Sequence, residues 1–140
     1  DAFDCVLMVD MLHHTDDIER ILFEAHRVAR HFVIVKDHFW KTRLDVVTLH
    51  VADYLGNIPY NVPLPYNYLR LDEWEDVFHR HNLRHVHQAT FKYNRLEPAH
   101  HIVAKLEVDP TRMSHYLPGR TGERLEPVRK RVLLGETAQP

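Results

Sequence analysis

The stretch of sequence that decides the fold runs from Phe3 to Asp37 and reads FDCVLMVDMLHHTDDIERILFEAHRVARHFVIVKD. It contains two continuous apolar runs, and each ends at an aspartate, Asp10 or Asp37, that precedes a histidine-bearing segment. Continuous rather than alternating apolarity is typical of strands buried on both faces, as in a parallel sheet covered by helices. We therefore expect both runs to be interior strands, with Cys5 as a core residue of the first.

The segment between the two runs has the pattern of an amphipathic helix. Thr15 or Asp16 is expected to cap its start. Its apolar residues recur on one stripe at helical spacing: Ile18, Ile21, Leu22, Ala25, Val28 and Ala29. Strand, helix and strand form a βαβ unit with a right-handed crossover. Ligands of open parallel sheets bind beyond the carboxyl ends of the strands, so we expect the polar clusters at 10–14 and 37–38 to carry the chemistry.

The bulk properties exclude several classes of protein. The 140 residues suit one domain or part of one, and 44% hydrophobic with 27% charged residues is ordinary for a soluble globular chain. A net charge of −2 gives no reason to expect nucleic acid or an anionic membrane as a partner. No apolar stretch is long enough to cross a bilayer. The single cysteine cannot form an internal disulfide, which favours a cytoplasmic location.

The start of the chain suggests a fragment. Asp1 stands only two residues before the first apolar run, so that run would present an unprotected strand edge. Native folds usually cover such an edge. We therefore expect a missing N-terminal half to pair with the first strand.

The rest of the chain predicts two more helices and a hairpin. A second helix begins near Thr42 and stops at Gly56, with a stripe formed by Leu44, Val47, Val51, Tyr54 and Leu55. The prolines of 57–71 exclude a helix or a central strand there. Asp72 is expected to cap a third helix, with Glu75 at the capping-box position and Trp74, Val77 and Phe78 facing inward, before a left-handed stop at Asn82.

Two strands are expected after the third helix, at 83–93 and 101–108, paired as an antiparallel hairpin. Beyond them the chain turns polar. We interpret 1–109 as the folded unit and 110–140 as a polar, flexible tail, with one or two helical turns near 128–134.

This order of elements resembles the C-terminal half of a class I S-adenosylmethionine-dependent methyltransferase. The segment 3–14 is similar to that family's fourth strand and following loop, and 24–37 to its next helix and fifth strand. The helix at 72–82 and the final hairpin are similar to its last elements. The resemblance implies an α/β fold with a partial Rossmann-like sheet: two parallel strands with a crossover helix, further helices, and a terminal antiparallel hairpin.

Part of the family's cofactor site has no counterpart here. Gly56 is the only glycine before the tail, so the chain contains no GxGxxG-type loop. No ribose-binding acid precedes the matched region. Arg30 and His31 stand where a Pro-Gly-Gly often precedes the fifth strand. The resemblance therefore implies that this chain alone is inactive and binds S-adenosyl-L-methionine poorly.

The resemblance also implies roles for the residues at the strand ends. Asp10, Met11 and Leu12 would line the methionine end of the cofactor. His13 or His14 would orient or deprotonate a small-molecule methyl acceptor, since imidazole titrates near neutral pH. The alternative is that one of these histidines caps the next helix or fills the strand end.

Further candidates lie on the acceptor side of the site. Asp37 is counted with the two histidines as catalytic, although an aspartate at a strand end also commonly bonds loop backbone. His38, Tyr66, Asn67 and Tyr68 are the candidates for acceptor binding, because aromatic walls with polar tips suit such pockets. The tyrosines could instead pack on the rim of the sheet.

The sequence gives less support to other kinds of active site. The 13 histidines invite a metal site, but no cysteine or carboxylate completes a plausible ligand set, so none is expected. Ser114 is the only serine and lies in the tail, which disfavours a serine hydrolase. Two alternative functions stay open: a non-catalytic methyltransferase-like scaffold that binds a protein partner, and another doubly wound enzyme such as a nucleotide-dependent oxidoreductase.

Overall fold

A computed structural model of the chain describes residues 2–60, 62–94, 97, 99–109 and 111. Apart from Thr111, the segment interpreted as a tail lies outside the described residues, as do Ser114 and the helical turns expected near 128–134.

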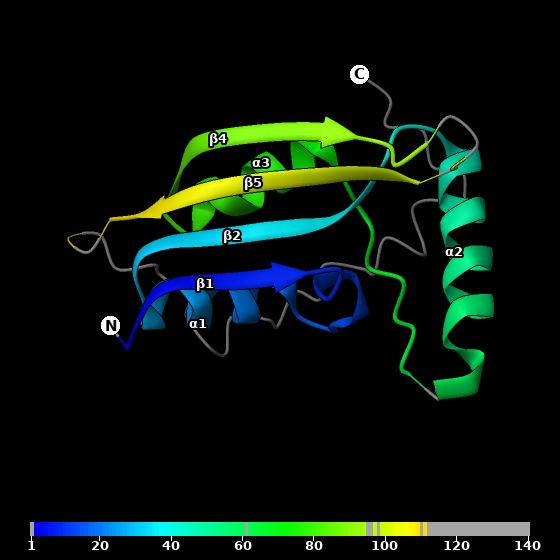
Figure 1. The fold of residues 1–140 in the computed structure, drawn as a ribbon, viewed down its shortest axis with the longest axis horizontal. Coiled ribbons are helices and arrows are strands. Elements are labelled where there is room, and N and C mark those ends of the chain that lie inside the picture. The colour runs from blue at the N-terminus through cyan, green and yellow to red at the C-terminus, as the bar shows by residue number, and fades with distance from the viewer. Residues whose placement is uncertain (1, 61, 95–96, 98, 110, 112–140) are drawn as a thin grey trace, which may run out of the picture.

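The described strands form one mixed sheet in the order β1-β2-β5-β4 (Figure 1). β1 (Phe3–Val9) and β2 (Ala29–Trp40) are parallel, while β4 (Leu83–Phe91) and β5 (His100–Val108) form an antiparallel hairpin that joins β2 through β5. The two-residue β3 (Leu69–Arg70) pairs with the end of β2. The expected fold class, with two parallel strands followed by a terminal hairpin, is confirmed.

Two helices pack on the same face of the sheet, α1 (Ile18–Val28) and α3 (Leu71–Arg80) (Figure 1). Their apolar sides bury Leu22 and Ala25 from α1, and Trp74, Val77 and Phe78 from α3, as predicted. These side chains share one core cluster with alternate residues of β2 and β5, among them Val33, Val35, Phe39, Ile102, Ala104 and Leu106. The core therefore lies between one face of the sheet and two helices.

The predicted helix caps were wrong by one or two residues at α1 and α3. Asp17 caps α1 by accepting from the Arg20 N–H at 2.9 Å, because the Thr15 hydroxyl is engaged with the Leu12 carbonyl in the preceding turn. Arg70 is the residue before α3, and its N–H donates to the Glu73 carboxylate at 2.7 Å. The left-handed stop at Asn82 is confirmed by its φ of 53°.

The expectation that β1 is buried on both faces was wrong. Phe3, Leu7 and Val9 are 60%, 63% and 50% exposed, and Cys5 is also exposed rather than in the core. The reason is that successive side chains of a strand point to opposite faces, and α1 covers only one of them. Within the described residues, the other face of β1 has no covering element.

The apolar stripe of α2 (Arg43–Asn57) also faces outward. The predicted start near Thr42 is confirmed, and Thr42 caps this helix with a capping box, but Leu44, Val47 and Leu55 are 73%, 59% and 65% exposed. Leu49, on the opposite side of α2, is the buried residue and packs with Tyr68 and Ala99. Figure 1 shows α2 standing beyond the carboxyl end of β1 instead of on a sheet face.

Among the described residues, no helix is both long and apolar enough to cross a membrane.

Candidate functional site

The predicted site residues lie where β1 and β2 end, side by side. Asp10 directly follows β1, and its N–H donates to the Lys36 carbonyl of β2 at 2.8 Å. Its φ of 48° places it in the left-handed region, which turns the chain sharply into the short helix η1 (Leu12–His14). This corner brings η1 against Asp37 and His38 near the end of β2.

Asp37 is the anchor of the site. Its side chain is fully buried and accepts three hydrogen bonds, from the Leu12 N–H at 2.9 Å, the His38 N–H at 2.7 Å and the His13 ring Nδ1 at 2.5 Å. Burial alone would raise the pKa of this carboxyl, but the hydrogen bonds from the two histidines outweigh it and hold the pKa far below its usual range. Asp37 is therefore an ionised group that fixes the loop after β1.

His13 is held from both sides. Its ring is 2% exposed, with Nδ1 on Asp37 and Nε2 3.4 Å from a carboxylate oxygen of Asp53 in α2. Burial lowers the pKa of His13, but the bond and charge of Asp37 outweigh this and raise it overall. With both ring nitrogens facing carboxylates, His13 is arranged to position its neighbours rather than to exchange a proton with an acceptor.

His14 is less buried than His13, although its Nδ1 is itself buried. It is half-buried, its ring lies 4.1 Å from that of His13, and among the described residues its Nδ1 has no hydrogen-bond partner. Burial, and then the neighbouring His13, lower its pKa, which favours the neutral form. Neutral imidazole is the form that can accept a proton.

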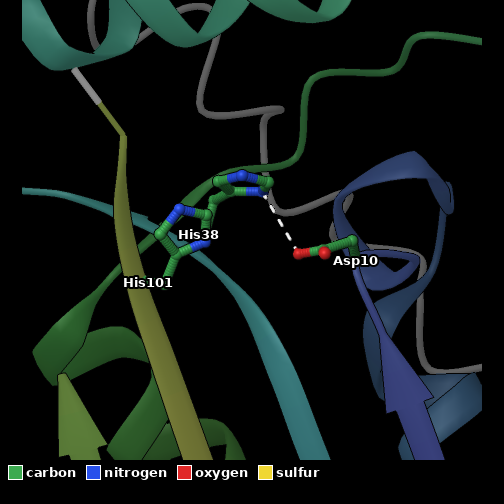
Figure 2. A group of neighbouring side chains, drawn as sticks. All are labelled: Asp10, His38 and His101. Atoms are coloured by element: carbon green, nitrogen blue, oxygen red, sulfur yellow. Dashed lines mark ion pairs between the residues drawn. The ribbon is translucent and has the colours of Figure 1, made fainter. Parts of the chain in front are cut away.

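A second polar group includes Asp10, His38 and His101, which Figure 2 draws, and Lys36. Both oxygens of Asp10 lie 2.5 Å from the Lys36 ammonium, and Nδ1 of His38 lies 3.8 Å from Asp10. Burial lowers the pKa of Lys36, but its hydrogen bonds to Asp10 and Tyr93 outweigh this and raise it. The ring of His101 on β5 lies 4.6 Å from that of His38.

The proline- and tyrosine-rich loop does pack beside η1. The Asn67 side chain donates to the Thr15 carbonyl at 2.5 Å, and its backbone N–H donates to the His13 carbonyl at 3.2 Å. The Tyr68 hydroxyl donates to Asp53, and the residue is 2% exposed. Both residues thus use polar atoms to hold the site together, while Tyr66, half-buried and stacked 4.2 Å from His50, lies further out.

The structure brings most of the sequence candidates together but gives them unequal access. Leu12 has no exposed side-chain surface and belongs to the core, so only its neighbours Asp10 and Met11 present side chains outward. The sequence analysis missed Lys36. A lysine within an apolar strand could have been noticed, because a buried charge needs a charged or hydrogen-bonding partner. Asp53 and His101 were also missed, because they reach the site only through helix placement and strand register.

The described residues fit part of S-adenosylmethionine. Asp10 has a half-exposed carboxylate, already paired with the Lys36 ammonium, beside the exposed Met11 side chain, and these are the kinds of group that the ammonium and apolar parts of the methionine end would contact. The unpartnered Nδ1 of His38 is a further buried polar atom at this corner. The glycine loop and ribose-binding acid that the rest of the cofactor needs are not in this sequence.

A shallow hollow elsewhere does not involve these residues. It lies at the opposite end of the sheet, between the start of β4 and the end of β5, and is lined by Leu83, Glu107 and their neighbours.

Comparison with known proteins finds similarity in structure but not in sequence. No known protein family matches the chain by sequence. No curated protein matches it either. The crystal structure of a proposed methyltransferase from Bacillus halodurans is similar with a TM-score of 0.55 at 11% identity, over 74% of this chain and 68% of that one. An arsenic(III) S-adenosylmethionine methyltransferase from Chlamydomonas reinhardtii aligns with a TM-score of 0.44 at 16% identity, over 84% of this chain.

The two proteins are covered to different extents, since this chain spans 68% of the first and 39% of the second. The similarity to the first shows that the chain shares the fold of that protein, with the strand order β1-β2-β5-β4 and a closing antiparallel hairpin.

Proposed function

We propose that the intact protein is an S-adenosylmethionine-dependent methyltransferase acting on a small-molecule acceptor, and that this chain supplies its C-terminal half. One observation carries the proposal. The sheet has methyltransferase topology, and its polar cluster stands at the carboxyl ends of the parallel strands, where α/β folds bind ligands. S-adenosylmethionine, when bound, supplies an activated methyl group, and the protein supplies orientation and electrostatics.

The residues form two sets: those whose side chains would face a ligand, and those that hold these side chains in place. Asp10 and Met11 are on the cofactor side, because both present side chains at the corner after β1. His14, His38 and Tyr66 are on the acceptor side. His14 is the candidate base, since its neutral ring has an unpartnered nitrogen.

Asp37, His13 and Tyr68 act on these groups indirectly. They join β2, η1 and α2 through buried hydrogen bonds, which keeps the corner after β1 in one geometry. Methyl transfer is a direct displacement and depends on holding nucleophile, methyl carbon and sulfur in line.

The remainder of the cofactor site would come from an upstream half paired with β1. This part of the proposal is supported by the exposed face of β1, with Phe3 at 60% and Leu7 at 63%, and by the absence of any partner but β2 for this strand among the described residues. Pairing would cover the free edge of β1, and native folds usually protect such an edge.

The test is binding of S-adenosylmethionine by the full-length gene product, measured by calorimetry. Asp10→Asn should weaken binding about tenfold, because it removes one charge-assisted interaction. Asp16→Asn, at an exposed position before α1, is the matched control and should bind as wild type does. A full-length product that binds no S-adenosylmethionine would instead favour the non-catalytic scaffold.

A separate arm tests the base. His14→Ala should lower the rate of methyl transfer to a responsive acceptor while leaving cofactor affinity unchanged. An unchanged rate would remove His14 from the mechanism.

A further inference from the structure

Three side chains from neighbouring parts of the sheet converge, as Figure 2 shows: Asp10 after β1, His38 on β2 and His101 on β5. The antiparallel register makes His38 and His101 direct cross-strand partners, so their side chains share one face. One potential ligand atom from each residue lies within 4.8 Å of those of the other two.

His101 is prepared as a ligand by a carboxylate behind it. Its Nε2 is 2.8 Å from an oxygen of Glu97, and the residue is 2% exposed. A carboxylate on one ring nitrogen keeps the proton there and leaves the lone pair on the other, an arrangement typical of metal-binding histidines. That other nitrogen, Nδ1, is buried and has no hydrogen-bond partner in the described part of the chain.

His38 presents the same feature from the neighbouring strand. Its Nδ1 is also buried without a hydrogen-bond partner among described residues, and it lies 3.8 Å from an oxygen of Asp10. Two ligands of a tetrahedral zinc ion, each about 2.0–2.1 Å from the metal, are about 3.3 Å apart. The His38–Asp10 spacing is therefore within one ångström of the value for a metal site, and the other two pairs lie within 4.8 Å.

We propose that Asp10, His38 and His101 bind one divalent transition-metal ion of the zinc class. Two imidazoles with one carboxylate favour such ions over Mg²⁺ and Ca²⁺, which prefer oxygen ligands. Three protein ligands leave at least one coordination position for water or an oxygen atom of a small molecule. The metal site goes beyond the proposed methyl transfer, although it uses the Asp10 carboxylate assigned there to the cofactor, so the metal ion and the cofactor ammonium would compete for that group.

The Lys36 ammonium competes with this ion for the Asp10 carboxylate. It already neutralises Asp10, so metal binding requires it to give up at least one oxygen. Tyr93 offers Lys36 an alternative contact, since the Lys36 nitrogen lies 5.3 Å from the centre of that ring. Removing the ammonium should therefore strengthen metal binding, whereas it would weaken a cluster held together only by the Asp10–Lys36 ion pair.

The experiment is titration of the full chain with Co²⁺, followed by its visible absorption, and competition by Zn²⁺. Wild type should bind one equivalent with the intense absorption of low-coordinate Co²⁺, unaffected by excess Mg²⁺. Asp10→Asn should lose at least about tenfold in affinity, and Glu97→Gln about tenfold through loss of the supporting carboxylate. Asparagine tolerates the left-handed conformation of Asp10, so this variant keeps its fold.

His31→Ala is the control for adventitious binding, because His31 is exposed on β2 away from the cluster. It should leave the absorption and affinity unchanged, and Lys36→Met should tighten binding. The proposal is overturned if wild type shows no such absorption, if Asp10→Asn and Glu97→Gln bind like wild type, or if Lys36→Met weakens binding. Because neither cofactor nor acceptor is present, failure here would leave the proposed methyl transfer intact.

Discussion

His13 and His38 lie side by side, with ring centres 4.9 Å apart, yet their rings differ in hydrogen bonding. Both ring nitrogens of His13 face carboxylates, those of Asp37 and Asp53. Nδ1 of His38 lies 3.7 Å from Asp37 and 3.8 Å from Asp10, too far for a hydrogen bond, and is buried without a hydrogen-bond partner among the described residues.

The contrast separates a structural histidine from a ligand-binding one. Burying an unpaired polar atom is unfavourable unless something else pairs with it. The paired His13 stabilises the corner after β1, whereas the unpaired His38 fits a group that binds from outside. Each of the following predictions breaks or sharpens this distinction.

The largest effect is expected from Asp37→Asn. The substitution removes the charge that pairs with His13 and sets an amide against three donors, so it should lower the free energy of unfolding by about 3–5 kcal/mol. Urea denaturation measures the change. Asp16→Asn, an exposed control, should differ from wild type by less than about 0.5 kcal/mol. Equal stability of the two variants would show that Asp37 is not the anchor.

The two histidines should respond differently to the same substitution. His13→Gln leaves buried Asp37 without its ring donor and should lower the free energy of unfolding by about 2–3 kcal/mol. His38→Gln, measured without metal, should change it by less than about 1 kcal/mol, because no hydrogen bond of the His38 ring to a described residue is lost. Similar losses in both variants would contradict the distinction.

Tyr68 extends the paired network. Its hydroxyl donates to Asp53, so Tyr68→Phe should lower the free energy of unfolding by about 1.5 kcal/mol. Tyr60→Phe is the matched control, because Tyr60 is 74% exposed and should tolerate the change. If Tyr68→Phe leaves the free energy of unfolding unchanged, the Tyr68 hydroxyl does not link α2 to the hydrogen bonds around His13.

The smallest effect concerns a more exposed histidine–carboxylate contact. Glu19 on α1 lies 3.0 Å from the His81 ring and pairs with Arg80, and these partners, the His81 hydrogen bond foremost, lower its pKa to about 2. A lowered carboxyl pKa contributes stability above its ordinary value of 4.5, which is lost as pH falls through about 2.

Because the Glu19 side chain is 33% exposed, its contribution should stay below about 1 kcal/mol. Unfolding measured between pH 5 and 2 should show a smaller decline for Glu19→Gln than for wild type. Parallel pH profiles would mean that the contact contributes nothing.

Periodicity predicted the elements well because it reflects the chain's own geometry. β1, α1, β2 and the hairpin follow from apolar runs and alternation that lie entirely within each segment. The same reasoning failed at α2, where the stripe with Leu44 and Val47 is real but exposed. A stripe shows which residues share a helix face, not which element covers that face.

The site was predictable in part for the same reason. Asp10, His13 and Asp37 follow the strands in sequence, so the rule for parallel sheets located them. His101 meets His38 only through the register of β2 with β5, and Asp53 reaches His13 only through the placement of α2. Neither contact can be predicted from the local sequence pattern. The expectation of no metal site was made without knowledge of the His38–His101 pairing.

The most direct test of the central claim is binding of S-adenosylmethionine by the full-length gene product carrying Asp10→Asn, with Asp16→Asn as control. The account predicts saturable binding by wild type and the control, and about tenfold weaker binding by Asp10→Asn. Binding that is the same in all three proteins, or absent from wild type, would contradict the assignment of the carboxyl ends of β1 and β2 as the cofactor side of a methyltransferase.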